Sequence, residues 1–252
     1  MILRLKGITK IFGGLKAVDQ VSAEIEQGVV YSIIGPNGAG KTTLLNLITG
    51  IYVPTEGQIE FNGEDVTNLG PDQLAKRGMS RTFQNLQICM NMSAIDNVMI
   101  GAHLKLNPNP IAGMFRFPSV VTADKACREK AIELIQFVGL EKFKDFNADQ
   151  LSYGVLKRLE IARALASEPK LMLLDEPAAG LNTSEKREIE ALIVKIAKTG
   201  ITIVLVEHDM KMVMNISDRI YVLDYGRKLA EGTAQEVRQN PDVIAAYLGA
   251  EA

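Results

Sequence analysis

A glycine-rich run near the N-terminus constrains the fold of this chain more than any other feature. Residues 35–42 read Gly-Pro-Asn-Gly-Ala-Gly-Lys-Thr and fit the pattern G-x-x-x-x-G-K-[ST]. Glycines let consecutive backbone N–H groups point inward around a phosphate, because no Cβ blocks the dihedral angles that this requires. Lys41 adds a positive charge for the outer phosphates, and the hydroxyl of Thr42 can ligate Mg²⁺. The run therefore predicts a phosphate-binding loop.

The segments on either side of this run match the context that the pattern demands. Residues 29–34 predict a buried strand, and residues 43–49 predict a helix that Gly50 ends. A strand, a glycine-rich loop and a helix N-terminus together form an anion site. The alternative is a turn that matches by chance, which these flanking elements disfavour. We therefore predict that a nucleotide is bound by Gly35, Asn37, Gly38, Ala39, Gly40, Lys41, Thr42 and Thr43.

Composition narrows the class of protein. The 252 residues are 47% hydrophobic and 23% charged, an ordinary globular balance, and they suffice for one large domain or a domain with an inserted lobe. The net charge of −2 gives no global attraction to nucleic acid or anionic lipid. No apolar run approaches the roughly 18 residues of a membrane span, so we expect any membrane role to come through a partner. Cys89 and Cys127 have no metal-site spacing, and we expect reduced thiols in a cytosolic protein.

Alternating strand and helix patterns predict an α/β layered core. Residues 171–174 and 201–206 are almost continuously apolar, as in parallel strands covered on both faces. Residues 184–198 have apolar side chains on one face of a helix. The predicted strands are 2–8, 29–34, 58–61, 171–175, 201–206, 219–224 and 227–230.

The middle of the chain differs, because residues 88–160 show helical periodicity and no convincing strand. We predict a helix over 122–139 with Thr122 as its N-cap, and a loop over 105–121, which holds three prolines. The tail is predicted to be helical with a break at Asn240-Pro241. The predicted domains are a discontinuous core of 1–87 and 161–232, a helical subdomain of 88–160, and a C-terminal helical tail of 233–252.

An apolar strand that ends in two acids is the second chemical feature. A buried parallel strand delivers its last carboxylate to the sheet edge where a phosphate loop also opens. Asp175 would then hold Mg²⁺ through water, and Glu176 would act as general base on the attacking water. The alternative is an ordinary acidic turn before a helix.

A third feature is Leu151-Ser-Tyr-Gly154, which precedes a helix predicted to begin near Leu156. Ser152 is a reasonable N-cap for that helix. The functional alternative is a second phosphate contact, made by the serine hydroxyl and the N–H groups of a helix N-terminus.

The order of these motifs resembles the ATP-binding subunits of ABC transporters over essentially the whole chain. The family pattern is a phosphate loop, a glutamine after a strand, Leu-Ser-x-Gly before a helix, an apolar strand ending in Asp-Glu, and a later histidine. The resemblance implies an α/β fold: a P-loop NTPase core of ABC ATPase type with an antiparallel β edge and an inserted α-helical subdomain. It also implies ATP and Mg²⁺ as ligands, with Thr42, Gln84 and Asp175 around the metal.

The resemblance assigns roles to further residues. Phe12 would stack on adenine, and Gln84 would contact Mg²⁺ and water and couple to the membrane subunit. Ser152 and Gly154 would form the signature motif, and His208 would reach the γ-phosphate. Each has an ordinary alternative: a core or surface aromatic, a solvated loop amide, a helix cap, or a structural histidine.

Two departures from the family pattern concern the signature motif and a later loop. Tyr153 and Val155 replace a glycine and a glutamine of the usual Leu-Ser-Gly-Gly-Gln. We expect Val155 to remove an amide near the nucleotide and to weaken ATP-driven closure or slow turnover. Asn182 stands where the family has an aspartate, which keeps a hydrogen-bonding side chain but removes a charge.

Three segments narrow the resemblance to the branched-chain amino-acid importer ATPases. These are residues 177–182, residues 207–211 followed by 216–219, and the ending 240–249. The alternative for the ending is a generic amphipathic helix. Other cargo, such as urea, lipopolysaccharide or another amino acid, remains open, as do a nucleic-acid-acting ATPase and a scaffold or regulatory ATPase.

The resemblance also implies partners and a location. We expect a second ABC ATPase subunit, identical or related, docked head to tail so that ATP lies between Lys41 of one chain and Ser152 of the other. We further expect integral membrane permease subunits, an indirect link to a substrate-binding protein, and no nucleic acid. The expected location is peripheral, at the cytoplasmic face of the inner membrane.

Overall fold

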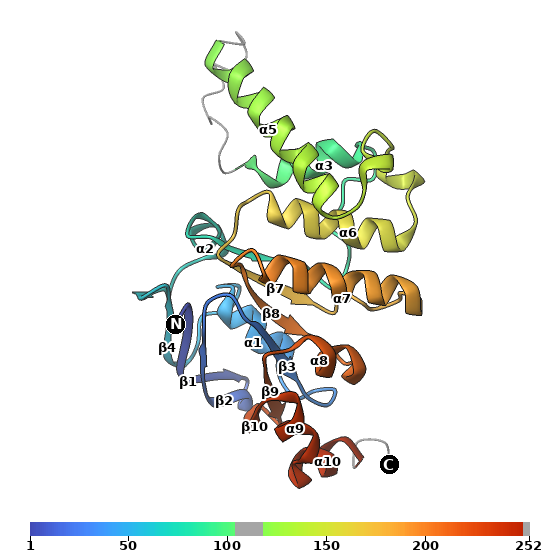
Figure 1. The fold of residues 1–252 in the computed structure, drawn as a ribbon. Coiled ribbons are helices and arrows are strands. Elements are labelled where there is room, and N and C mark those ends of the chain that lie inside the picture. Colours follow the sequence, from blue (N-terminus) through green and yellow to red (C-terminus); the bar gives the residue numbers. More distant parts are fainter. Residues whose placement is uncertain (104–117, 249–252) are drawn as a thin grey trace. The chain divides into compact units, whose positions relative to one another are not determined.

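The computed structural model describes residues 1–103 and 118–248, and the chain divides into two compact units (Figure 1). Unit 1 combines Met1–Arg81 with the segment that begins at Lys170, and unit 2 is Thr82–Pro169. Unit 2 contains the whole of the lobe predicted over 88–160 and extends beyond it at both ends.

A six-stranded sheet forms the centre of unit 1, in the order β10-β9-β3-β8-β7-β6. All neighbours run parallel except β10 and β9, which are antiparallel. Every residue of β7 and β8 is buried, so the prediction of parallel strands covered on both faces is confirmed. The strands are β3 (Val30–Ile34), β6 (Met79–Arg81), β7 (Leu171–Asp175), β8 (Thr202–Val206), β9 (Arg219–Asp224) and β10 (Arg227–Gly232).

A separate antiparallel sheet in the order β2-β1-β4-β5 supplies the predicted β edge. The sequence reasoning missed β2, although Val21, Ala23 and Ile25 alternate with exposed polar residues as a half-buried strand requires. The strands are β1 (Leu3–Phe12), β2 (Leu15–Ile25), β4 (Glu56–Phe61) and β5 (Glu64–Asp65).

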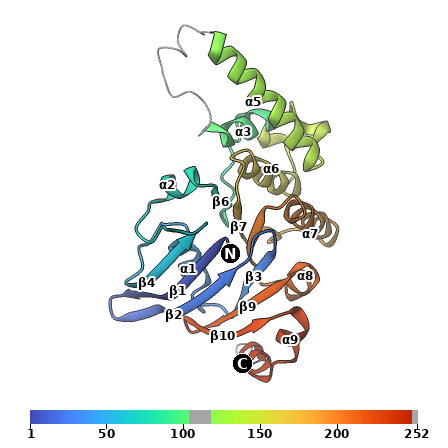
Figure 2. The same ribbon diagram turned by 60° about the vertical axis from the view of Figure 1, so that its left-hand side comes forward.

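Six described helices belong to unit 1 (Figure 2), and two of them, α2 and α8, were not predicted. The helix after the phosphate loop begins at Lys41 rather than at residue 43. The predicted break at Asn240-Pro241 is confirmed, because Asn240 separates two helices. The helices are α1 (Lys41–Ile48), α2 (Pro71–Lys76), α7 (Thr183–Ala197), α8 (Met210–Ile216), α9 (Ala234–Gln239) and α10 (Pro241–Leu248).

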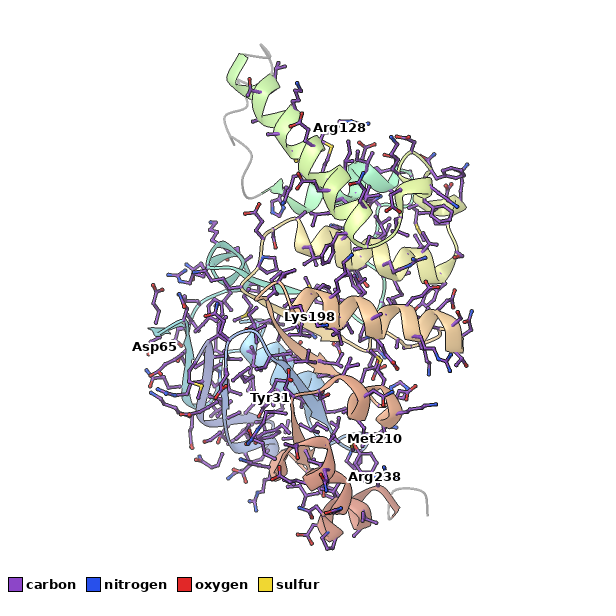
Figure 3. All side chains as sticks on the ribbon, in the orientation of Figure 1. Tyr31, Asp65, Arg128, Lys198, Met210 and Arg238 are labelled. Carbon is purple, nitrogen blue, oxygen red and sulfur yellow. The ribbon has the colours of Figure 1, made fainter. Side chains whose placement is uncertain are left out.

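Strand β3 lies between two apolar clusters because its side chains alternate between the faces of the sheet. Tyr31, labelled in Figure 3, and Ile33 join a cluster that includes α1 and the antiparallel sheet. Ile34 joins the cluster on the other face, to which α8, α9 and α10 contribute Val213, Val237 and Val243. The residue just before the phosphate loop is therefore held by the C-terminal helices.

Unit 2 is helical in its described part, where the isolated strand-type bridge joins Ser93 and Asn147. Helices α3 and α6 approach so closely that a Cβ on Gly101 would lie 2.0 Å from the carbonyl oxygen of Arg163. The described helices are α3 (Ala94–Gly101), α5 (Pro118–Phe137) and α6 (Tyr153–Leu165), with short 3₁₀ turns η2 (Glu141–Phe143) and η3 (Ala148–Gln150).

Two predictions for unit 2 were wrong at helix starts. Helix α5 begins at Pro118, so Thr122 is not its N-cap and residues 118–121 are helical rather than loop. Proline suits a first helical turn, where its missing N–H has no partner to lose. Helix α6 begins at Tyr153, three residues before the predicted start at Leu156. Most of the loop predicted over 105–121 lies outside the described residues.

Candidate nucleotide site

The glycine-rich run forms a tight loop between β3 and α1. Gly38 and Gly40 both have positive φ angles, of 80° and 100°. A Cβ on Gly40 would lie 2.4 Å from the carbonyl oxygen of Ala17, so only glycine fits that position. Asn37 and Thr42 are exposed while Ala39 is buried. The loop therefore presents its open side to solvent at the N-terminus of a helix, as an anion site requires.

Lys41 is held inside this loop by the loop's own backbone. Its ammonium donates to the carbonyl oxygens of Gly35 and Pro36, at 2.6 and 2.9 Å. Burial lowers the pKa of Lys41, and the nearby charges of Glu176 and Asp175 oppose that shift. The charges of both carboxylates therefore act on the ammonium of Lys41.

The turn between β9 and β10 supports the loop from outside. The N–H of Gly226 donates to the carbonyl oxygen of Ala39 at 2.9 Å, and the N–H of Asp19 donates to that of Gly226 at 2.8 Å. The carboxylate of Asp19 accepts from Arg227 at 2.6 and 2.8 Å. The pattern-based reasoning did not single out Asp19 or Arg227, because they lie outside any motif and far apart in the chain.

Asp175 ends β7 and is buried in an ion pair. Its Oδ2 lies 3.0 Å from Nη2 of Arg81, and both side chains are only 8% exposed. The same guanidinium donates to Oδ1 of Asn46 on α1 and to Oγ1 of Thr49, the C-cap residue of that helix. Arg81 therefore connects strand β7 to the helix that follows the phosphate loop. The sequence patterns did not predict a role for Arg81 either.

Glu176 and His208 face each other across the ends of β7 and β8. Oε1 of Glu176 lies 3.7 Å from Nδ1 of His208. The N–H of Glu176 donates to the carbonyl oxygen of Val206 at 2.9 Å. Glu176 has a φ of 48°, which is unusual for a residue with a side chain. The His208 side chain is 63% exposed, so it is available to a ligand rather than buried as a structural histidine.

A third acid, Glu207, lies beneath this pair with 1% exposure. Its Oε1 accepts from the N–H of Ala178 at 2.9 Å, and its Oε2 accepts from the N–H of His208 at 3.1 Å. Burial raises the pKa of Glu207, while these N–H groups oppose the rise. Glu207 lies in one of the segments that resemble the importer ATPases, but no pattern in the sequence predicted a role for it.

Phe12 is not a core residue. Its side chain is 41% exposed and packs edge-on against Tyr52, with ring centroids 5.3 Å apart. Nζ of Lys10 lies 5.3 Å from the centre of its ring. The ring is accessible to solvent, which is compatible with stacking on adenine.

The remaining predicted residues belong to unit 2. Ser152 occupies the N-cap position of α6, but its side chain makes no capping hydrogen bond, so the interpretation as a simple cap is not supported. Gly154 is buried, and Val155 is only 6% exposed. Val155 therefore packs into the core of unit 2, where an amide would need a buried partner.

Helix α6 also holds the segment that contains Gln84. Lys157, which is 2% exposed, donates to the carbonyl oxygen of Gln84 at 3.4 Å, and Arg163 donates to that of Gln87. Burial raises the pKa of Glu160, and backbone N–H groups of Gln87 and Phe83 oppose the rise. Three charged residues spaced three apart on one helix thus bind the backbone around Gln84.

Asn182 has a clear local role. Its side chain accepts from the N–H groups of Ser184 and Glu185 at 2.9 and 3.1 Å, and the carboxylate of Glu185 accepts from the N–H of Asn182 at 3.0 Å. This capping box starts α7. The substitution of the family's aspartate therefore keeps the cap.

Two absences apply to the residues that the structure describes. No group of three or more histidine, cysteine, aspartate or glutamate residues is placed there to hold a metal ion. No helix in the same residues has the length and apolar character that crossing a bilayer needs.

Comparison with known families and proteins identifies the fold. A family model described as ABC transporter matches residues 18–179, and one described as branched-chain amino acid ATP-binding cassette transporter matches residues 227–252. The chain belongs to the ABC transporter family. It is therefore an ATPase with a nucleotide-binding cassette, and the predicted ABC ATPase fold is confirmed.

Named relatives and solved structures match this chain over nearly its whole length. The chain is 45% identical over 249 residues to the high-affinity branched-chain amino acid transport ATP-binding protein BraF of Pseudomonas aeruginosa, covering 98% of each chain. It is similar to the crystal structure of an ABC transporter cassette in its ADP conformation, with a TM-score of 0.86, 36% identity and 98% coverage of each chain. A second cassette, titled a dimeric post-hydrolysis state bound to ADP and Pi, has a TM-score of 0.76 and 29% identity, covering 92% of this chain and 99% of its own.

Proposed function

We propose that this ABC cassette is the ATP-binding and ATP-hydrolysing subunit of an importer for branched-chain amino acids. The observation that carries the ATPase site is the grouping of Lys41 with Asp175 and Glu176 in unit 1, with His208 beside Glu176. The cargo assignment is supported by the similarity to BraF over 98% of both chains and by the family match at residues 227–252.

The site residues have distinct chemical tasks in this proposal. Lys41 and the N–H groups of residues 35–43 bind the phosphates, and Phe12 stacks on adenine. Thr42, Asp175 and Gln84 are the residues that would hold Mg²⁺, and the hydroxyl and carboxylate oxygens fit its preference for oxygen ligands. When bound, Mg²⁺ neutralises charge on the phosphate oxygens.

Glu176 acts as general base in the hydrolysis. Its carboxylate accepts a proton from the attacking water, whose oxygen bonds to the γ-phosphorus as the bond to the leaving ADP oxygen breaks. His208 donates a hydrogen bond to a γ-phosphate oxygen. The open face of His208, with 63% of its side chain exposed, supports this role.

Two chains are proposed to dock head to tail. Ser152 and Gly154 of one chain then complete the phosphate site formed by Lys41 of the other, so ATP holds the pair together and hydrolysis releases it. The unsatisfied N-cap position of Ser152 supports the proposal, because its hydroxyl is not used within α6. The dimeric post-hydrolysis cassette among the similar structures also supports it.

The transport role is proposed to operate at the cytoplasmic face of the membrane, with integral permease subunits and an indirect link to a substrate-binding protein. The test starts with tagged chain purified from detergent-solubilised native membranes. We expect integral membrane proteins to co-purify, and the reconstituted complex to take up labelled leucine, isoleucine or valine with ATP. The complex with Lys41→Ala is the control and should be inactive.

Other outcomes would redirect the proposal. Uptake of urea or an unrelated amino acid, with none of the three branched-chain amino acids, would overturn the cargo assignment but keep the ATPase role. ATPase stimulation by DNA together with no membrane partner would overturn the transport role itself.

A further inference from the structure

The buried carboxylate of Glu207 connects the two chain segments that carry Glu176 and His208, the residues that the proposed mechanism assigns to the γ-phosphate and its attacking water. We propose that Glu207 is a positioning residue that fixes Glu176 and His208 relative to each other. The inference rests on the proposed function of that pair.

Two hydrogen bonds join the turn after β7 to the end of β8 and the segment that follows it, and a third lies within that segment. The N–H of Glu176 donates to the carbonyl oxygen of Val206 at 2.9 Å. Two residues later the N–H of Ala178 donates to Oε1 of Glu207, also at 2.9 Å. The N–H of His208 donates to Oε2 of Glu207 at 3.1 Å. The same carboxylate therefore holds both segments, although Ala178 and Glu207 are 29 residues apart in the chain.

A carboxylate is needed for this arrangement because each oxygen serves a different N–H donor. A glutamine side chain has one acceptor oxygen, and its NH₂ group would face the other N–H. One of the two contacts would then be lost in a site that is 1% exposed, where a buried N–H without a partner is costly.

The backbone at Glu176 also needs this support. Its φ of 48° is sparsely populated for residues with a Cβ, and such conformations persist only where surrounding contacts hold them. The hydrogen bonds of Glu176 and Ala178 lie on both sides of the strained position. His208 gains its backbone contact from the same acid, so the 3.7 Å separation of Oε1 of Glu176 and Nδ1 of His208 depends on Glu207.

The distinguishing experiment is a double-mutant cycle on ATP turnover, made in the full chain with Glu176→Gln, Glu207→Gln and both together. We expect Glu207→Gln to lower kcat about 10- to 100-fold, because small misplacements of reacting groups cost about that much. KM for ATP should change less than about twofold, because Glu207 does not contact the phosphate loop. Glu176→Gln should lower kcat about 10²- to 10⁴-fold, the usual effect of losing a general base.

The double variant decides between positioning and a separate contribution. If Glu207 acts by positioning Glu176 and His208, adding Glu207→Gln to Glu176→Gln should lower kcat by clearly less than Glu207→Gln lowers it alone. Full additivity would overturn the positioning role, as would wild-type kcat in Glu207→Gln. Wild-type kcat in Glu176→Gln would instead contradict the proposed mechanism, so the two failures are distinguishable. Glu141→Gln, at an exposed position, is the matched control and should leave kcat unchanged.

A measurement on the unmodified chain keeps the inference testable if Glu207→Gln does not fold. Amide hydrogen exchange at Ala178 and His208 should be slow, because both N–H groups are bonded to a buried carboxylate. Rapid exchange of both amides in the folded chain would overturn the inference. In a folded Glu207→Gln chain we expect faster exchange at one of these two amides and no change in exchange at Leu205 in β8.

Discussion

At the scale of single residues, Lys41 shows how the nucleotide site is prepared. Its ammonium donates to the carbonyl oxygens of Gly35 and Pro36, so the positive charge is already directed into the loop. Burial lowers the pKa of Lys41, and Glu176 and Asp175 oppose that shift. A lysine in this environment is stabilised further by an anion, which replaces the weaker carbonyl contacts.

The first prediction is that Lys41→Ala weakens ATP binding about 10- to 100-fold. The change removes charge-assisted hydrogen bonds worth about 1.5–3 kcal/mol each. Titration calorimetry with ATP and Mg²⁺ measures the affinity. The matched control is Lys198→Ala, an exposed lysine beyond α7 that is labelled in Figure 3. Equal affinity in Lys41→Ala and the control would remove Lys41 from the site.

At the scale of elements, helix α6 supports the segment around Gln84 through one charged face. Lys157 and Arg163 donate to backbone carbonyls of that segment, and the buried acid Glu160 interacts with its N–H groups. A loop that would otherwise be anchored only at its ends is thereby held along its length. Helix α6 and the Gln84 segment are therefore expected to behave as one element of unit 2.

The second prediction is that Glu160→Ala loosens residues 83–87. The change removes the carboxylate that accepts from the backbone N–H groups of Phe83 and Gln87, so we expect a loss of about 1.5–3 kcal/mol in the free energy of unfolding. Urea unfolding measures this loss, and hydrogen exchange should become faster at Phe83 and Gln87. Glu129→Ala, at an exposed position on α5, serves as the control. Unchanged exchange at Phe83 and Gln87 would show that Glu160 does not hold the segment.

At the scale of the whole molecule, the structure shows how unit 1 joins its two sheets beside the phosphate loop. Asp19 lies on β2 of the antiparallel sheet, and Arg227 lies on β10 of the six-stranded sheet. Their ion pair spans 208 residues of sequence. The hydrogen bonds from Arg227, and then those from Lys16, lower the pKa of the Asp19 carboxyl.

The third prediction concerns the pH dependence of this connection. A carboxyl whose folded-state pKa is lowered contributes stability above its unfolded pKa, about 3.9, and loses it as pH falls through the folded value. Asp19→Asn should therefore lower the melting temperature at pH 7. The difference from wild type should shrink below about pH 4 and vanish below the folded-state pKa. A difference that is independent of pH would contradict the ion-pair explanation.

The sequence by itself determined the parts of this protein that depend on local order. A phosphate loop requires glycines, a lysine and a hydroxyl at fixed spacing, so residues 35–42 predict one without knowledge of the fold, and the structure has a tight loop there before α1. The parallel strands β7 and β8 were predictable because complete burial requires continuous apolar runs. These features arise from neighbours in the chain, which a sequence pattern records directly.

Only the tertiary structure decided the contacts that join distant segments. Arg81 and Asp175 are 94 residues apart, and Ala178 and Glu207 are 29 apart, yet each pair is bonded in the folded chain. Hydrogen bonds of this kind depend on where strands end in space, and one sequence has no pattern that marks them. The prediction of Thr122 as a helix cap was also wrong, because helix α5 begins at Pro118. Local patterns thus identified the chemical groups, whereas packing of the strands determined which groups support one another.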